Sequence, residues 1–323
     1  MELARLPNED YFKHKVRLCR AKEHGELPQV SWKEIVDILG EDISPDTLRK
    51  ASKGLIEYDD YLNSVKHNDT AILSISDLHI PFQLDYHILN EYKERVDILV
   101  LNGDISDMQA ISKFSKAYRI SPMEEIIKTR EYLISLIEFL KPKQAVINYG
   151  NHDVRFERYL SKNLDTDLIE LMPRTQLELI ILDGFNHFDK RAGTKIWYQP
   201  LKDLFSDSDI KYTNNWWCQI GDAIFCHPTA CSSGILKTSE KAMTWFKNEG
   251  CTFSNLITAH THHSGQYTIG NTTIYEQGAF CDVAANNYSD GRLSNSQKEG
   301  YIILYQDGDG VTIKDRTKLK VLN

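Results

Sequence analysis

From residue 70 onward, short apolar runs rich in β-branched residues alternate with longer segments of helical periodicity. The strand-like runs are AILSIS (71–76), DILVL (97–101), QAVINY (144–149), DAIFC (222–226), FSNLITA (253–259) and YIILY (301–305). Helical patterns at about 85–94 and 107–140 separate the first three runs. Strands that alternate with helices predict βαβ units, in which helices cover the faces of a sheet. This part of the chain is therefore expected to be α/β.

Two later segments refine that expectation. QYTIGNTTIYEQ (266–277) has two strand-like halves around an Asn-centred turn, which predicts a hairpin and hence a mixed sheet. Residues 161–213 are polar and weakly periodic, so we expect irregular structure there.

The chain before residue 68 has a different character and predicts three helices, at about 9–23, 31–39 and 45–63. Ser31 to Glu34 form a capping-box sequence, and Ser44-Pro45 is a typical helix start. The short link GEDIS between the second and third helices has the length and the glycine of a helix-turn-helix. We therefore predict a helical, helix-turn-helix-like module over 1–67 and a second domain over 68–323.

Composition is that of a soluble globular protein, with 41% apolar and 26% charged residues. No apolar run reaches the roughly 18 residues of a membrane span, and the start MELARLPNED does not look like a signal peptide. Six cysteines are scattered without a C-x-x-C pair, which argues against zinc-thiolate sites and disulfides. We expect a cytoplasmic protein without a membrane partner.

Charge alone does not identify a partner. The net charge of −8 is unlike that of a simple nucleic-acid binder, because phosphate neutralisation requires Lys and Arg. The distribution is uneven, however, since residues 11–22 contain five Lys or Arg and no acid.

Five polar clusters each follow one of the strand-like runs. They are Asp77-Leu78-His79, Gly103-Asp104-Ile105-Ser106-Asp107, Gly150-Asn151-His152-Asp153, His227 and His260-Thr261-His262. In an open α/β sheet, ligands bind outside the carboxyl ends of the strands. The five clusters are therefore expected to meet in one crevice.

The residue types in these clusters predict a metal site. Asp77 and His79 are spaced i, i+2, so an extended segment would point both to one side, and His260 and His262 repeat that spacing. Two carboxylates, one amide oxygen and four imidazoles suit Mn, Fe or Zn rather than a calcium cage or a thiolate cluster. Seven ligands suit two ions that share a carboxylate, about 3.5–4 Å apart, as in enzymes of phosphate-ester hydrolysis.

The ordered motifs D-L-H, G-D-I-S-D, G-N-H-D, an isolated H and A-H-T-H resemble those of the calcineurin-like metallophosphoesterases, over about residues 70–280. The resemblance implies a two-layer αββα sandwich with a dinuclear centre. It assigns one ion to Asp77, His79 and His262, the other ion to Asn151, His227 and His260, and the bridging position to Asp104. The expected cofactors are two divalent ions, with Mn first and Fe or Zn as alternatives.

The resemblance also implies a mechanism. His152 matches the family's histidine that binds no metal and assists the leaving group, and Asp107 matches the acid that orients this histidine. A carboxylate that holds an imidazole in one tautomer makes the imidazole more basic, which agrees with these roles. The nucleophile would be a hydroxide that bridges the two ions.

Departures from the family pattern bear on the substrate. Ala259 replaces the glycine of the usual G-H-x-H motif, which leaves both ligands in place. Met108 stands where protein Ser/Thr phosphatases have the Arg that grips a phosphomonoester, and Asp153 stands where they have Glu. Short G-N-H-D motifs are typical of the nuclease and phosphodiesterase branches. Arg155 and Arg158 are candidates for substrate-phosphate contacts, or alternatively belong to an ordinary surface helix.

Other residues have competing interpretations. His14, His24, His67, His87 and His187 lie outside any motif and are expected to be solvated. Of Trp216 and Trp217, which should face opposite sides of a strand, one is expected in the core and the other could stack on a base. The third N-terminal helix could contact DNA through Arg49, Lys50 and Lys53. However, residues 1–67 carry 11 basic and 13 acidic residues, so protein docking or self-association is the alternative.

The sequence therefore predicts a dinuclear-metal phosphoesterase that cleaves phosphodiester bonds, in particular a DNA or RNA nuclease. Its organisation resembles that of phage metallophosphoesterases with a helix-turn-helix front end that helps to hold substrate or partner. The alternatives are a phosphomonoesterase, a small-molecule or cyclic-nucleotide phosphodiesterase, and a non-catalytic nucleic-acid-binding regulator.

Overall fold

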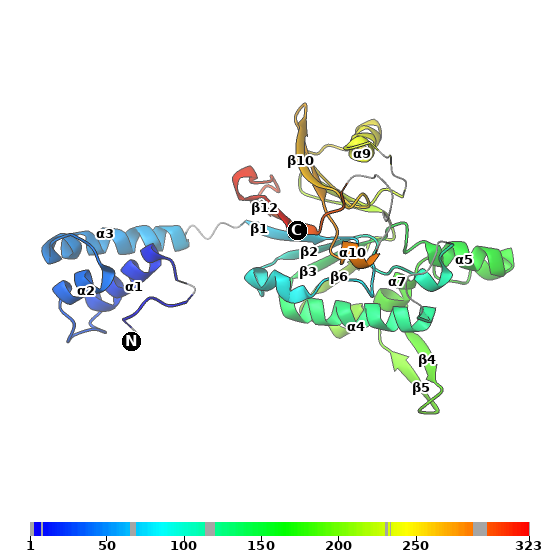
Figure 1. Cartoon of the computed structure of the whole chain (residues 1–323), viewed down its shortest axis with the longest axis horizontal. Coiled ribbons are helices and arrows are strands. Elements are labelled where there is room, and N and C mark those ends of the chain that lie inside the picture. The colour runs from blue at the N-terminus through cyan, green and yellow to red at the C-terminus, as the bar shows by residue number, and fades with distance from the viewer. Residues whose placement is uncertain are drawn as a thin grey trace. The chain divides into compact units, whose positions relative to one another are not determined.

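The computed structural model describes residues 3–7, 9–64, 69–113, 120–229, 232, 234–286 and 296–322, without the side chains of 60–64 and 286. The chain divides into two compact units, Met1–Asn68 and Asp69–Asn323 (Figure 1). His67 lies outside the described residues. None of the helices in the described ranges combines the length and the apolarity that crossing a membrane requires.

Three α-helices form the first unit: α1 (Tyr11–Glu23), α2 (Trp32–Leu39) and α3 (Pro45–Ser64). Ser31 and Glu34 form the expected capping box at the start of α2, and Gly40 ends the helix in a left-handed conformation. Leu18, Ile35 and Leu48, one from each helix, are fully buried in a shared core. Packing of these amphipathic faces holds the three helices together.

One histidine of this unit differs from its prediction. His14 is 5% exposed, and its Nε2 lies 2.9 Å from the carbonyl oxygen of Leu3. The expectation that it is solvated was wrong, because the spacing of α1 places it on the same face as the buried Leu18, four residues later.

Two mixed sheets form the second unit. The first has the order β13-β12-β1-β2-β3-β6 and the second β10-β11-β9-β8-β7. The first contains β1 (Thr70–Ile75), β2 (Ile98–Asn102), β3 (Gln144–Asn148), β6 (Asp209–Tyr212), β12 (Gly300–Gln306) and β13 (Lys318–Val321). The second contains β7 (Trp217–Ile220), β8 (Ala223–Cys226), β9 (Asn255–Thr258), β10 (Ser264–Ile269) and β11 (Thr272–Gln277). The predicted hairpin is β10–β11, and β1, β2, β3 and β6 are mutually parallel.

The two sheets pack face to face, with helices on both outer faces. Ile72 and Val100 of the first sheet share a buried cluster with Phe225 and Ile257 of the second. Helix α4 (Pro122–Leu140) covers the outer face of the first sheet, and α9 (Lys237–Asn248) covers that of the second (Figure 1). The expected αββα sandwich, with a small helical domain before it, is confirmed.

Two helix predictions in the second unit were partly wrong. The segment predicted as a helix from 107 becomes one only at Pro122, because Ser121 caps the helix and proline fits its first turn. Before it, the described residues contain the short 3₁₀ turn η2 (Gln109–Ile111). The segment at 85–94 is the 3₁₀ helix η1 (Tyr86–Tyr92), capped by Asp85, rather than an α-helix.

The expectation of irregular structure over 161–213 was also wrong. The segment holds the end of α5 (Arg155–Asn163), then α6 (Thr166–Ile169), α7 (Gln176–Glu178), the π-turn η3 (Leu179–Asp183), the hairpin β4–β5 (Phe185–Asp189, Thr194–Tyr198), α8 (Leu201–Leu204) and β6. These elements are short, and contacts distant in sequence stabilise them; β6, for example, pairs with β3. The remaining short elements are α10 (Val283–Asn286) and η4 (Lys314–Arg316).

Candidate metal centre

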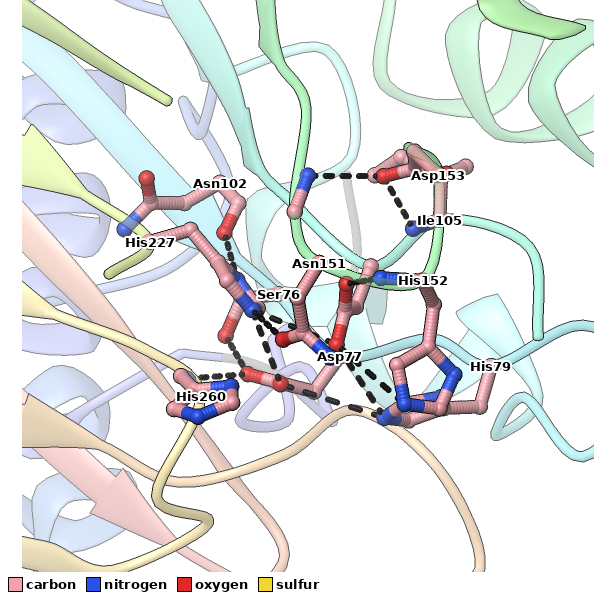
Figure 2. Close-up of polar contacts among 12 residues, drawn as sticks. Ser76, Asp77, His79, Asn102, Ile105, Asn151, His152, Asp153, His227 and His260 are labelled. Atoms are coloured by element: carbon pink, nitrogen blue, oxygen red, sulfur yellow. Dashed lines mark hydrogen bonds and ion pairs between the residues drawn. The ribbon is translucent and has the colours of Figure 1, made fainter. Parts of the chain in front are cut away.

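The five polar clusters meet at the carboxyl ends of β1, β2, β3, β8 and β9, as expected for an α/β sheet. Figure 2 shows the side chains of Asp77, His79 and His227 pointing toward one another. Three sets of residues could each hold a metal ion, because the ligand atoms within each set lie within 4.8 Å of one another. The sets are Asp77, His79 and His262; Asp104, His227 and His260; and His79, Asp104 and His152. The first set holds the three residues predicted for one ion, and the second holds two residues predicted for the other ion together with the predicted bridge, Asp104. The third set includes His152, which was predicted to bind no metal.

The first set is compact and buried. Nε2 of His262 lies 3.2 Å from Oδ1 of Asp77 and 3.2 Å from Nε2 of His79. The other ring nitrogen of His79, Nδ1, donates to Oδ1 of Asp107 at 3.2 Å. Because a carboxylate can only accept, Nε2 of His79 is left with a lone pair that points into the set.

The second set has the same arrangement. Nε2 of His227 lies 3.2 Å from Oδ2 of Asp104 and 3.3 Å from Oδ1 of Asn151. Its Nδ1 donates to the carbonyl oxygen of Asn102 at 2.9 Å, so Nε2 is the ring nitrogen that faces Asp104 and Asn151. The ring centroid of His260 is 5.3 Å from that of His227.

Asp104 lies between the two sets. Its Oδ2 is 3.2 Å from Nε2 of His227 and 3.9 Å from Nε2 of His79. Its Oδ1 accepts the backbone N–H of His152 at 2.7 Å. This is the position that a carboxylate shared by two ions requires.

The backbone at these residues differs from the extended segments that the i, i+2 spacing suggested. Asp77, His79, Asp104, His260 and His262 all have positive φ, between 45° and 78°. Left-handed backbone is uncommon for residues other than glycine and concentrates at functional sites. The paired ligands therefore converge through tight turns after the strands, and not through strand alternation.

Two glycines permit the close approach of these turns. A Cβ on Gly103 would lie 2.5 Å from the ring of His227, and a Cβ on Gly150 would lie 2.1 Å from Oδ1 of Asp104. Gly103 also has φ of +81°. Only glycine fits at either position without displacing a candidate ligand.

The two side chains predicted to act in catalysis, His152 and Asp107, are in contact beside the candidate ligands. Nδ1 of His152 donates to Oδ1 of Asp107 at 2.8 Å, the same oxygen that holds His79. Arg155 donates to Nε2 of His152 at 2.8 Å and to the carbonyl oxygen of Asp107 at 2.7 Å. One carboxylate thus orients a candidate ligand and the adjacent histidine, and a guanidinium contacts Nε2 of that histidine, the nitrogen that lies 3.8 Å from Oδ2 of Asp104.

Arg158 and the two tryptophans lie elsewhere. Arg158 is exposed on α5, whereas Arg155 of the same helix is partly buried against the two residues predicted to act in catalysis. Trp216 stacks on Phe246 with ring centroids 5.3 Å apart, and Trp217 meets the edge of the same ring at 5.1 Å. The expectation that they face opposite sides was wrong, because β7 begins only at Trp217 and strand alternation does not extend to Trp216.

A buried hydrogen-bonded group that the sequence did not reveal connects the loops of the site. Asp153 accepts the backbone N–H groups of Gly150, Ile105 and Ser106, at 2.9, 3.3 and 3.3 Å (Figure 2). Gln176 donates to Oδ1 of Asp153 at 2.8 Å and to the hydroxyl of Ser106 at 2.9 Å. The loop that carries Asp104 is thereby tied to the loop that carries His152. No sequence signal marks Gln176, which lies in the segment expected to be irregular.

Burial and charge shift the pKa values of the site in opposite directions. Burial raises the pKa of Asp77 and Asp104, but nearby imidazoles, above all that of His227, outweigh this and hold both below the usual range. Burial lowers the pKa of His227, but Asp104 and Asp77 raise it to about 9. Burial and the neighbouring His227 lower the pKa of His260 to about 4. The site thus keeps its carboxylates ionised.

These residues fit divalent cations. Oδ1 of Asp77 is buried and receives no hydrogen bond from the described part of the chain. Nε2 of His79 and Nε2 of His227 face ionised carboxylates, and a divalent cation that replaces the proton of His227 would be bound by nitrogen and oxygen together. The set of imidazole nitrogens with carboxylate and amide oxygens suits borderline transition-metal ions.

The sequence profile of the family described as calcineurin-like phosphoesterase matches residues 70–264, more than half of the chain. The chain belongs to this family. It is therefore a metal-dependent phosphoesterase, and the buried His/Asp clusters are its candidate metal site.

Several solved structures are similar to the phosphoesterase at low sequence identity. Vacuolar protein sorting 29 from Cryptosporidium parvum shares 13% identity over 79% of this chain and 98% of its own, with a TM-score of 0.34. Vps29 from Entamoeba histolytica, complexed with Zn²⁺, shares 12% sequence identity over 78% of this chain and 98% of its own, with a TM-score of 0.35. An archaeal phosphodiesterase shares 13% sequence identity over 78% of this chain and 100% of its own, with a TM-score of 0.36. No curated protein matches the chain.

Proposed function

We propose that the phosphoesterase hydrolyses phosphodiester bonds in nucleic acid. The observation that supports this choice is the position of Arg155, which contacts both His152 and Asp107, while the neighbouring Met108 is fully buried. A phosphomonoester dianion is gripped best by several cations, whereas a diester carries one negative charge. One guanidinium beside the candidate leaving-group histidine suits the diester.

The candidate ligands divide between two ions in this proposal. Asp77, His79 and His262 hold one ion; Asn151, His227 and His260 hold the other; and Asp104 is shared. The ions would supply Lewis acidity and activate a water for attack at phosphorus. Asn151 contributes a neutral oxygen, which limits the negative charge that an incoming phosphate meets.

His152 acts on the leaving oxygen, and Arg155 controls when it can do so. Nε2 of His152 accepts a hydrogen bond from Arg155, so in this arrangement it has no proton to donate. A bound phosphate offers Arg155 a charged acceptor, which draws the guanidinium from Nε2; this nitrogen can then take up a proton from water and donate it to the leaving oxygen as the bond to phosphorus breaks. Asp107 keeps the ring oriented throughout through Nδ1.

Arg155→Lys tests this role. A lysine keeps the charge but loses the two-pronged contact, so KM for a diester should rise by about tenfold. Arg158→Lys, on the exposed side of the same helix, is the matched control and should leave KM unchanged. An unchanged KM for the Arg155 variant would remove this residue from the substrate site.

The substrate class is decided by comparing Mn²⁺-dependent hydrolysis of bis(p-nitrophenyl) phosphate, p-nitrophenyl phosphate, a cyclic nucleotide, and labelled single- and double-stranded DNA and RNA. We expect hydrolysis of the diester and of at least one nucleic acid, and a loss of about 100-fold in His152→Ala. Activity confined to the monoester would contradict the proposal. Activity confined to small diesters would identify a small-molecule phosphodiesterase.

We propose manganese as the resident metal, with iron and zinc as the alternatives, because the donor set accepts all three. Elemental analysis of protein purified without added metal, followed by reconstitution with each ion, distinguishes them. We also propose a cytoplasmic location. Its support is that Cys19, Cys218, Cys226 and Cys251 are thiols outside any disulfide.

A further inference from the structure

A hollow of about 510 Å³ lies on the surface of the N-terminal helical unit. It is lined by Lys22, Glu23, Trp32, Arg49, Lys50 and Lys53. Side chains from all three helices therefore converge on one concavity that carries four cations and a single acid.

The other cations of the basic run 11–22 are largely committed within the unit. Lys15 pairs with Glu41, Arg17 with Glu9, and Arg20 with Asp59, each at 2.7 Å. These pairs are partly buried, and those of Lys15 and Arg20 join α1 to segments distant in sequence. Most of the charge of that run therefore stabilises the fold.

Three of the four cations of the hollow are available by contrast, whereas the fourth, Lys22, is half-buried and its Nζ donates to the carbonyl oxygen of Leu27 at 3.1 Å. Arg49 and Lys50 both pair with Asp46, but side chains on both sides are more than half exposed, so these contacts are weak and readily exchanged. Lys53 is exposed. The one acid of the lining, Glu23, already accepts a hydrogen bond from the buried hydroxyl of Ser52 at 2.5 Å.

We propose that this hollow, the helical-unit hollow, binds phosphates of a nucleic-acid backbone and supplies a sequence-independent grip on the polymer. Arg49 offers a planar fork for phosphate oxygens, and Lys22, Lys50 and Lys53 add point charges. Trp32 is half-buried, so its remaining face is available for a sugar or base. The choice of nucleic acid as the polyanion rests on the proposed function.

Backbone binding explains the charge pattern better than groove reading does. Helix α3 also carries Glu57 and Asp59, further along than Lys53, and acids on an inserted helix would repel the phosphates on both sides of a groove. A hollow on the surface of the unit can contact phosphates without insertion of the whole helix. It therefore adds affinity without reading bases.

The test measures binding by the full-length protein, with metal chelated, to a fluorescent single-stranded and a double-stranded DNA across a range of NaCl concentrations. The variant is Lys22→Glu with Lys53→Glu. The matched control is Lys13→Glu with Lys33→Glu, which changes the net charge equally at exposed lysines that do not line the hollow. Mn²⁺-dependent hydrolysis of bis(p-nitrophenyl) phosphate reports on the metal centre separately.

We expect Kd to rise by about tenfold or more in the hollow variant and the salt slope to fall by about two, with small changes in the control. Diester hydrolysis should be unchanged in both. If circular dichroism shows that the variant is unfolded, Lys22→Gln with Lys53→Gln replaces it with the same expectation.

If the control variant weakens DNA binding as much as the hollow variant does, the inference is overturned, because net charge and not the hollow would then govern binding. Polyglutamate that competes as well as DNA would also overturn it, in favour of an acidic protein partner. If DNA binds through the hollow but no nucleic acid is cleaved, the inference stands and the proposed function fails.

Discussion

Asp104 is the residue on which both candidate ion sites depend. Oδ2 faces an imidazole of each set, and Oδ1 accepts the N–H of His152. Its replacement should therefore affect both ions and the catalytic histidine together. Conservative substitution of this one side chain tests the arrangement most directly.

Asp104→Asn should lower metal content and reduce diester hydrolysis by about 100-fold or more, because the shared position loses its charge. Elemental analysis and steady-state kinetics measure the two effects. Asp203→Asn, an exposed acid on α8, is the matched control and should change neither. Full metal occupancy in the Asp104→Asn variant would show that the two ions do not share this residue.

Glu125 is a buried acid near the carboxylate of Asp107. Burial, with the Asp107 carboxylate nearby, raises its pKa from 4.5 to about 8. Below pH 4.5 the folded and unfolded chains both hold this proton. As pH rises toward 8 the unfolded chain releases it first, so the stability that the protonated acid contributes is lost over this window.

Glu125→Gln should therefore be more stable than the parent at about pH 8, and the advantage should shrink toward about pH 5. Urea unfolding at several pH values measures the difference in the free energy of unfolding between the variant and the parent. Glu124→Gln, on the exposed side of the same turn, should show only a small difference that does not grow with pH. An advantage independent of pH would mean that Glu125 is ionised in the folded protein.

At the scale of the element, the turns after the strands, rather than the strands themselves, position the candidate ligands. Five candidate ligands have left-handed backbone, and two glycines allow the turns to touch. Asp153 and Gln176 then fasten two of these turns to each other. The geometry of the site is thus determined by the turns and by their hydrogen bonds.

Gly150→Ala should displace Asp104, since its Cβ would lie 2.1 Å from Oδ1 of that residue. We expect a loss of about 2 kcal/mol or more of stability and little remaining diester hydrolysis. Gly308→Ala, where no atom lies within 4 Å, is the control and should be close to neutral. Thermal unfolding and kinetics of both variants decide the matter; near-parental activity of the Gly150 variant would refute the close-packed turn.

Gln176→Leu should lower kcat without lowering stability to the same degree, because the leucine fills the space but removes one hydrogen bond from Ser106 and one from Asp153. A role in positioning predicts that Mn²⁺ affinity and kcat fall while KM for the diester changes little. Gln199→Leu, at an exposed glutamine outside the site, serves as the comparison. A uniform loss of folded protein, with unchanged kcat in what remains, would assign Gln176 to stability alone.

At the scale of the whole molecule, the candidate metal ligands all belong to the unit Asp69–Asn323. Mn²⁺ should therefore stabilise that unit by mass action, by about 2.7 kcal/mol at a hundredfold excess over Kd. The unfolding of residues 1–68 should not respond. Calorimetry with and without Mn²⁺, using Asp77→Asn as the control, measures this; a shift that survives in the control would place the ion elsewhere.

The sequence by itself determined the α/β class and the set of residues at the strand ends. These follow from local information, since apolar periodicity and strand-end position depend on neighbours along the chain. The family-specific order of D-L-H, G-D-I-S-D and G-N-H-D then led to the metallophosphoesterases and their sandwich. The helix boundaries at Ser31 and Gly40 were predictable from the chain alone, because capping is local.

Only the tertiary structure decided how those residues converge. The left-handed turns at Asp77 and His260 arise where loops from different strands compete for one space, and the link from Gln176 to Asp153 spans 23 residues. The grouping of Lys22 with Lys53 on one hollow likewise depends on how three helices pack. Contacts between segments distant in sequence determine such features, and no local pattern in the chain specifies them.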